Sequence, residues 1–176
     1  MDLLSFLLVY GGETLDFESD SEFYSGDEGQ KPSVAEFIYS AINADGNHLI
    51  NPVYDKVYTT YVEMFLKSVP QERIVHNLLN SPDRDIQEIS AQLSVEKYPL
   101  TVKNFEAALT TTSSWLVTYV PKAILVYVDK KLESAIFALR KRLTVSCGEL
   151  EQEDTMREMI RLQNVQRQVK AKMKRQ

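Results

Sequence analysis

The side chains that could do chemistry are few, and they do not form a group typical of an enzyme. Asp83 and Asp85 make a D-x-D pair, an arrangement that can hold magnesium when it lies at the end of a strand. Here the pair follows Ser81 and Pro82 and opens a predicted helix, where carboxylates cap the backbone and favour the helix dipole. We therefore interpret the pair as a helix cap. Cys147 has no His or other base nearby in the sequence and is interpreted as a bystander.

Sequence motifs for nucleotide binding, hydrolysis and zinc binding are absent. No G-x-x-x-x-G-K-[ST], G-x-G-x-x-G, G-x-S-x-G or H-E-x-x-H occurs. One Cys and two His, His48 and His76, are too few for the ligand cluster of a structural zinc site. We expect this chain to have no catalytic residues, no metal site and no cofactor, and so not to be an enzyme.

The apolar opening LLSFLLVYG could be a secretion signal, a membrane segment or a core helix. No Lys or Arg precedes Lys31, so the basic start of a signal peptide is missing. The run is also far shorter than the roughly 20 apolar residues that a membrane span needs. Helical spacing and a terminal glycine predict a buried helix with no membrane role, from the residues Leu3, Leu4, Leu7, Leu8 and Gly11.

Composition fits a globular protein, and the charge is unevenly distributed. The chain has 176 residues, 44% of them apolar, which suffices for one sizeable core or two small ones. Its single cysteine excludes an internal disulfide framework and predicts a cytoplasmic protein. The net charge is −5, but residues 121–176 carry 13 basic and 7 acidic side chains. This asymmetry indicates either a partner for the basic segment or two solvated surfaces of opposite sign.

Apolar periodicity predicts helices along most of the first 119 residues, and no segment alternates as a strand. The predicted helical segments are 3–10, 32–46 with Pro32 in its first turn, 51–68, 70–80, 81–94 and 101–119, the last being ambiguous after Thr110. Residues 13–31 are predicted to be an acidic loop. An aromatic-rich stripe in 51–68 is interpreted as core, and comprises Tyr54, Val57, Tyr58, Tyr61, Val62 and Phe65.

The last third of the chain predicts a hairpin of two long helices. Apolar residues spaced 3, 4, 3 and 4 give segment 121–143 a heptad-like seam, formed by Leu125, Val128, Leu132, Ala135 and Leu139. Residues 146–154 are the predicted break, and 154–176 the second helix, so the helices should run antiparallel. The sequence thus predicts an all-α protein with a helical bundle at 1–119 and a hairpin at 120–176. The link at Tyr119–Pro121 could be a kink, a hinge or continuous helix.

The second arm of the hairpin combines a methionine-rich stripe with basic side chains. Packing within the chain, a protein partner and nucleic acid are all consistent with this pattern. We favour a protein partner, because Met surfaces adapt and helix faces dock in grooves. Nucleic acid ranks third because the chain is acidic and its aromatics lie elsewhere. The candidate partner-binding residues are Met156, Met159, Arg161, Leu162, Val165 (with Gln166 as the alternative in the stripe), Arg167, Val169, Lys170 and Met173.

A resemblance that covers nearly the whole chain is carried by four sequence segments: LLSFLLVYG, EFIYSAINADGNHLINPVYDKVYTTY, LLNSPDRDIQEISAQLSVEKYPL and VPKAILVYVDKKL. Their order and spacing resemble the C-terminal region of bacterial DnaG-type primases, most of all the Bacteroidetes branch. The resemblance implies a helicase-binding domain, built from a helical subdomain and a helical hairpin. Such a domain docks on the N-terminal domains of the hexameric, DnaB-type replicative helicase.

The zinc-binding and polymerase modules of a primase are absent from this sequence, so the resemblance implies a module that does not synthesise RNA. The hairpin varies within that family, and the candidate contact residues rest only on the amphipathic stripe and the basic side chains. The alternative interpretation is a cytosolic helical adaptor that self-associates through its coiled-coil-like hairpin, as the Leu125 to Leu139 seam would allow.

Overall fold

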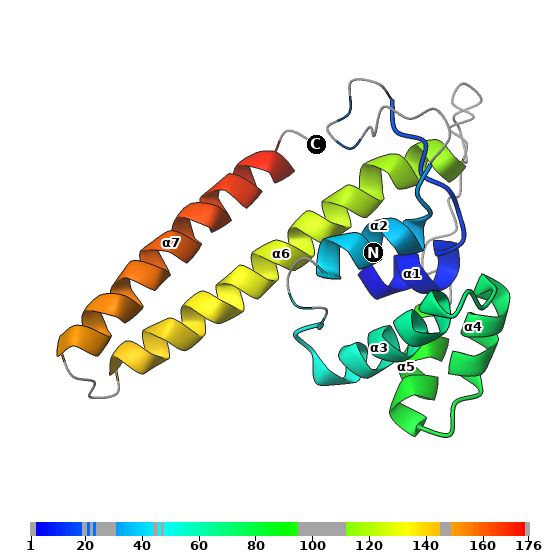
Figure 1. Cartoon of the computed structure of the whole chain (residues 1–176), viewed down its shortest axis with the longest axis horizontal. Helices are drawn as coiled ribbons and strands as arrows, with labels where there is room; N and C mark the ends of the chain where they lie inside the picture. The colour runs from blue at the N-terminus through cyan, green and yellow to red at the C-terminus, as the bar shows by residue number, and fades with distance from the viewer. Residues whose placement is uncertain are drawn as a thin grey trace. The chain divides into compact units, whose positions relative to one another are not determined.

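The protein is all-α, as the sequence predicts. The computed structural model describes residues 3–18, 21, 23, 31–43, 46, 48–94, 112–144 and 149–174, which form the helices labelled in Figure 1. The helices are α1 (Leu3–Tyr10), α2 (Val34–Asn43), α3 (Pro52–Leu66), α4 (Gln71–Leu79), α5 (Arg84–Ser94), α6 (Thr112–Thr144) and α7 (Glu149–Met173). They belong to two compact units, Met1–Val120 and Pro121–Gln176. Most of the predicted acidic loop, residues 101–111 and Cys147 lie outside the described residues.

Helix α1 is the buried element of the first unit. All residues from Leu3 to Leu8, Ser5 included, are 7% exposed or less. A helix that is apolar on every side is stable only when other elements surround it. α1 packs against α2 and α5, and α3, α4 and α5 pack against one another. The apolar opening of the chain is therefore a core helix, as predicted.

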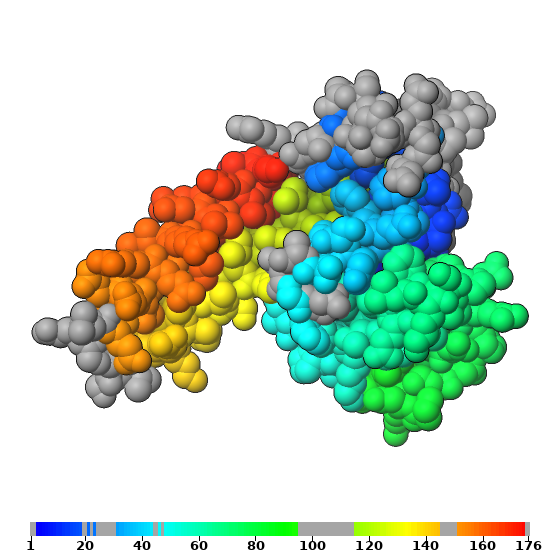
Figure 2. Space-filling model, viewed as in Figure 1, coloured from blue at the N-terminus to red at the C-terminus, as the bar shows by residue number. Residues whose placement is uncertain are grey.

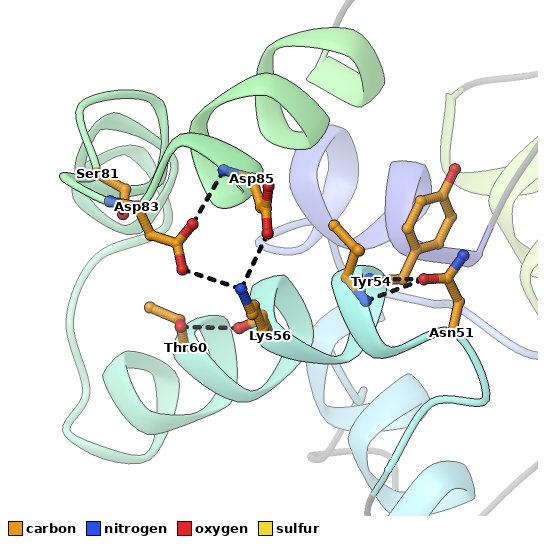
Figure 3. Close-up of polar contacts among 8 residues, drawn as sticks. Asn51, Tyr54, Lys56, Thr60, Ser81, Asp83 and Asp85 are labelled. Carbon is orange, nitrogen blue, oxygen red and sulfur yellow. Dashed lines mark hydrogen bonds and ion pairs between the residues drawn. The ribbon is translucent and has the colours of Figure 1, made fainter.

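Local capping fixes where α2 and α3 begin. The Asn51 side chain accepts hydrogen bonds from the backbone N–H groups of Val53, at 2.9 Å, and Tyr54, at 3.4 Å (Figure 3). Ser33 and Glu36 form a reciprocal capping box, with N···O distances of 2.7 and 3.1 Å. The prediction that Pro32 lies in the first turn of its helix is wrong, because the Ser33 cap starts α2 at Val34.

The aromatic-rich stripe of α3 is core, as predicted, with Val57, Tyr58, Tyr61 and Val62 buried. The Tyr61 hydroxyl donates a hydrogen bond to Oε1 of Gln71, at the start of α4. Nε2 of Gln71 donates in turn to the carbonyls of Leu7, at 2.9 Å, and Leu8, at 3.1 Å. Helix C-termini leave carbonyls without helical partners, and this side chain satisfies two of them. Burial raises the pKa of Tyr61, which keeps its hydroxyl protonated and able to donate.

The beginning of α6 is attached to α1 by aromatic packing within the first unit. The Trp115 ring lies 5.6 Å from the rings of both Phe6 and Tyr10, and Tyr119 lies 5.2 Å from Trp115. These contacts order a segment whose hydroxyl and β-branched residues have weak helix propensity. The helix starts at Thr112, within the stretch that the sequence leaves ambiguous, and continues through Pro121, so of the three possibilities for the link at Tyr119–Pro121 the structure has continuous helix.

The second long helix also begins earlier than its sequence pattern predicts. The predicted break at 146–154 is wrong from Glu149 onward, because α7 starts there. Glu151 and Glu153 lie in the opening turns, where negative charge interacts favourably with the helix dipole. The acidic residues within the predicted break therefore stabilise the start of a helix instead.

Gly11 lies where the end of α1 meets Tyr61 and Gln71, and it generates the first prediction. A Cβ atom at this position would overlap Oη of Tyr61 and the carbonyl oxygen of Leu7, and would lie 2.7 Å from Oε1 of Gln71. Overpacking of this kind costs about 1–3 kcal/mol. We expect Gly11→Ala to lower the free energy of unfolding by that amount in urea titrations.

The neighbouring glycine provides the matched control. A Cβ at Gly12 would meet only the Cβ and Cγ atoms of Gln71, at 3.3 and 3.6 Å, so Gly12→Ala should cost clearly less. Equal losses for the two substitutions would contradict the close packing at Gly11.

Candidate functional site

The second unit is the hairpin that the sequence predicts, with α7 antiparallel to the part of α6 that follows Pro121 (Figure 1). A polar contact joins the two helices, in which Nε2 of Gln166 donates to Oδ1 of Asp129 at 2.9 Å. Nζ of Lys170 lies 3.6 Å from the same oxygen. In the space-filling view, side chains of the two helices fill the space between their ribbons (Figure 2). A buried or half-buried polar contact of this kind selects one register for the pair.

The predicted heptad seam runs along the inner side of α6. Leu125, Val128, Leu132 and Ala135 are half-buried, and Leu139 is buried together with Ile136. On α7 the inner residues repeat at intervals of four and three: Thr155, Met159, Leu162, Gln166, Val169 and Met173. The sequence left Val165 and Gln166 open as alternatives for this stripe. The structure places Gln166 in the seam, where it bonds Asp129, and leaves Val165 38% exposed.

The structure divides the predicted partner-binding residues into two groups. Met159, Leu162, Val169 and Met173 are half-buried in the seam, so part of their apolar surface packs within the chain. The exposed group is Met156, Arg161, Val165, Arg167 and Lys170, of which Lys170 approaches Asp129. The methionine-rich stripe is thus mainly an internal contact, and the exposed candidate residues are a different set.

Two exposed apolar residues of the hairpin were missed by the sequence analysis. Phe137 on α6 is 68% exposed, and Ile160 on α7 is 54% exposed, the same fraction as Met156. Neither fits the repeat of its own helix seam: Ile160 directly follows the seam residue Met159, and Phe137 follows Ile136, which is buried but is not part of the Leu125 to Leu139 repeat. An apolar residue that is out of phase with a strong heptad is the signal that could have identified both.

Basic side chains surround these apolar residues. Arg157 pairs with Glu153 one turn earlier, at 2.6 Å. Arg140, Arg161 and Arg167 are exposed and have no ion pair with any other residue that the structure describes. The hairpin therefore combines exposed apolar side chains with unpaired positive charge.

The D-x-D pair is a helix cap, as predicted (Figure 3). Oδ1 of Asp83 accepts the backbone N–H of Asp85 at 2.9 Å. Nζ of Lys56 on α3 lies 3.3 Å from Oδ2 of Asp83 and 2.9 Å from Oδ2 of Asp85. The lysine ammonium occupies the position between the two carboxylates that a cation would take. No cluster of three or more metal-type side chains occurs among the described residues.

No described helix is both long enough and apolar enough to cross a membrane.

The cap at α5 predicts a pH dependence. The backbone hydrogen bond from Asp85, together with the nearby Lys56, lowers the pKa of Asp83. A carboxylate with a lowered pKa stabilises the fold fully above its unfolded value of about 3.9, and the contribution is lost as the pH falls towards the lowered pKa. The melting temperature of Asp83→Asn should therefore lie below that of the wild type at neutral pH and converge with it in acid.

Asp83→Ala distinguishes the charge from the cap, because asparagine still caps a helix and alanine does not. Asp83→Ala should be less stable than Asp83→Asn at every pH. A deficit of Asp83→Asn that is the same at about pH 3 as at pH 7 would contradict the lowered pKa.

The contact between Asp129 and Gln166 predicts a measurable coupling across the hairpin. A double-mutant cycle of Asp129→Ala and Gln166→Ala should give an interaction energy of about 0.5–1.5 kcal/mol in urea unfolding. Gln168 is exposed on the same helix and serves as the matched control, so the cycle of Asp129→Ala with Gln168→Ala should give a value near zero. Equal coupling in both cycles would argue against a specific bond.

Comparison with known proteins gives a family and no activity. A family model described as "Domain of unknown function (DUF8430)" matches residues 1–175, and so spans both units. No curated protein and no solved structure matches the chain. With nearly every residue matched, the chain belongs to the DUF8430 family of domains of unknown function.

Proposed function

We propose that this chain is the non-catalytic helicase-binding module of a cytoplasmic DnaG-type primase. It would tether the primase to the hexameric replicative helicase during DNA replication, with the hairpin as the docking element. The observation that carries the proposal is the hairpin itself. Its seam is occupied by its own side chains, and yet it leaves Phe137, Met156 and Ile160 more than half exposed.

Physical considerations support a docking role for those side chains. Single exposed apolar residues are ordinary, whereas several on one element, surrounded by charges, are typical of interaction sites. Methionine adapts to varied partner surfaces, and aromatic residues contribute strongly to interfaces. The fold also has the organisation that the primase resemblance implies, a helical unit followed by a helical hairpin. The proposal involves no catalysis, metal or cofactor.

The alternative is an adaptor that self-associates through the Leu125 to Leu139 seam. In the structure the inner side of this seam lies against α7, as the bond from Gln166 to Asp129 requires. The inner surface is therefore already used within one chain, and this favours the docking proposal. Sedimentation velocity over a wide concentration range separates the two, because a monomer at all concentrations excludes the adaptor.

Calorimetric titration of the chain into the replicative helicase of the same organism tests the proposal. We expect binding with a defined stoichiometry on the hexamer, and an affinity that falls as salt increases because basic side chains contribute. Absence of heat at several temperatures and at low salt, with both proteins folded, would contradict it.

A chain that ends at Val145 tests the role of the hairpin. It lacks α7 and should lose helicase binding, while the first unit keeps its own core. Trp115 is the only tryptophan and packs against Phe6 within that unit, so its fluorescence reports whether the unit remains folded. Full affinity in the shortened chain would remove the hairpin from the binding site.

A further inference from the structure

The two sides of the hairpin can be distinguished by position relative to the seam. Successive residues of an α-helix are rotated by about 100°, so residues that directly follow a seam residue lie on one side and residues that directly precede one lie on the other. Asp129 follows Val128, and Lys170 follows Val169; the two approach to 3.6 Å across the seam. In both helices, therefore, the residues that directly follow a seam residue lie on the same side of the hairpin.

Among the described residues of the hairpin, three large apolar residues are more than half exposed, and each directly follows a residue that is buried or half-buried between the helices. Phe137 follows Ile136, Met156 follows Thr155, and Ile160 follows Met159. Met156 and Ile160 are also neighbours on α7, because residues four apart are stacked on one helix face. We call this side the 137/160 face, and its members include Phe137, Arg140, Met156, Ile160 and Arg167.

The two helices bring these residues to a similar level along the hairpin. Asp129 contacts both Gln166 and Lys170. Because the two helices are antiparallel, each later residue of α6 lies level with an earlier residue of α7. Eight residues beyond Asp129, Phe137 is therefore level with residues 158–162 of α7, a range that includes Ile160. The apolar part of the face thus spans both helices at one height.

The charge on the 137/160 face is basic. Arg140 and Arg167 are on it and are unpaired among the described residues, and Lys174, which follows Met173, adds a third cation. Glu133, which follows Leu132, is exposed on the same side, so positive charges outnumber negative charges there. On the opposite side, Val165 is the apolar residue with high exposure, at 38%. Lys131 and Lys172 on that opposite side already interact with other groups. The strongest apolar exposure therefore coincides with two unpaired arginines on one side, whereas Arg161 is on the other side.

We infer that the 137/160 face is the helicase-docking surface, and that it receives an acidic protein surface that presents apolar side chains. This inference rests on the proposed function and deepens it by naming the side of the hairpin and the chemistry of its partner. Charge complementarity selects the partner, since unpaired arginines around an apolar centre favour carboxylates around apolar side chains. Exposed Phe137, Met156 and Ile160 offer nothing to a phosphate backbone, which favours protein over nucleic acid.

Calorimetric titration of full-length variants into the same helicase tests the inference. Phe137→Ser and Ile160→Ser should each weaken binding at least about tenfold, because exposed anchors of this size dominate interfaces. Val165→Ser removes an exposed apolar side chain from the opposite side and should change the dissociation constant less than about threefold. Circular dichroism should show unchanged helix content in all three variants.

Two charge-reversal substitutions test whether the partner surface is acidic. Arg167→Glu should weaken binding several-fold more than Arg161→Glu, its counterpart on the opposite side, and should reduce the salt dependence of the affinity. Equal losses from the two substitutions would contradict an acidic partner surface on the 137/160 face. A single-stranded DNA oligonucleotide bound as tightly as the helicase would also overturn the inference.

The outcomes separate the inference from the proposed function. Suppose that the wild type binds the helicase normally. If Phe137→Ser and Ile160→Ser bind as tightly as the wild type, or if Val165→Ser weakens binding as much as they do, only the assignment of the face is overturned. No binding by the wild type overturns the proposed function and the docking surface with it.

Discussion

The first unit depends on how the C-terminal end of α1 is satisfied. This helix is buried on every side, so water cannot reach the carbonyls that its last turn leaves free. The amide of Gln71 supplies donors to Leu7 and Leu8 and accepts the hydroxyl of Tyr61. The absence of a side chain at Gly11 allows these groups to approach. α2, α5 and the Trp115 ring all contact α1. The hydrogen bonds of Gln71 therefore stabilise a helix on which elements far apart in the sequence pack.

In the hairpin, too, a polar contact between side chains of two helices fixes how the helices pack. Its half-buried seam contains one polar pair, Asp129 with Gln166, and such pairs tend to specify register more than they add stability. Once the register is set, the out-of-phase residues Phe137, Met156 and Ile160 all lie on one side. The residues that pack between the two helices are therefore different from the exposed residues that we propose for docking.

The residues best suited to chemistry serve structure where the structure describes them. Asp83 and Asp85 cap α5 and bind Lys56, Tyr61 fastens α1, and Glu36 closes a capping box. Each carboxylate or hydroxyl is engaged with a backbone group or a neighbouring side chain. These side chains therefore act within the fold of the first unit.

The sequence by itself determined the fold class, most helices and the existence of the hairpin, because apolar periodicity and caps such as Asn51 and Asp83 act over a few residues. It also placed Tyr58 and Tyr61 in the core. It left the residues after Thr110 ambiguous and the link at Pro121 open, because the packing of Trp115 on Phe6 and Tyr10, and not local propensity, orders the start of α6. It could not assign Gln166 to the seam, or separate Met159 inside from Met156 outside, because both follow from the register with Asp129. Only the tertiary structure decides register, since it depends on contacts between residues 37 positions apart in the chain.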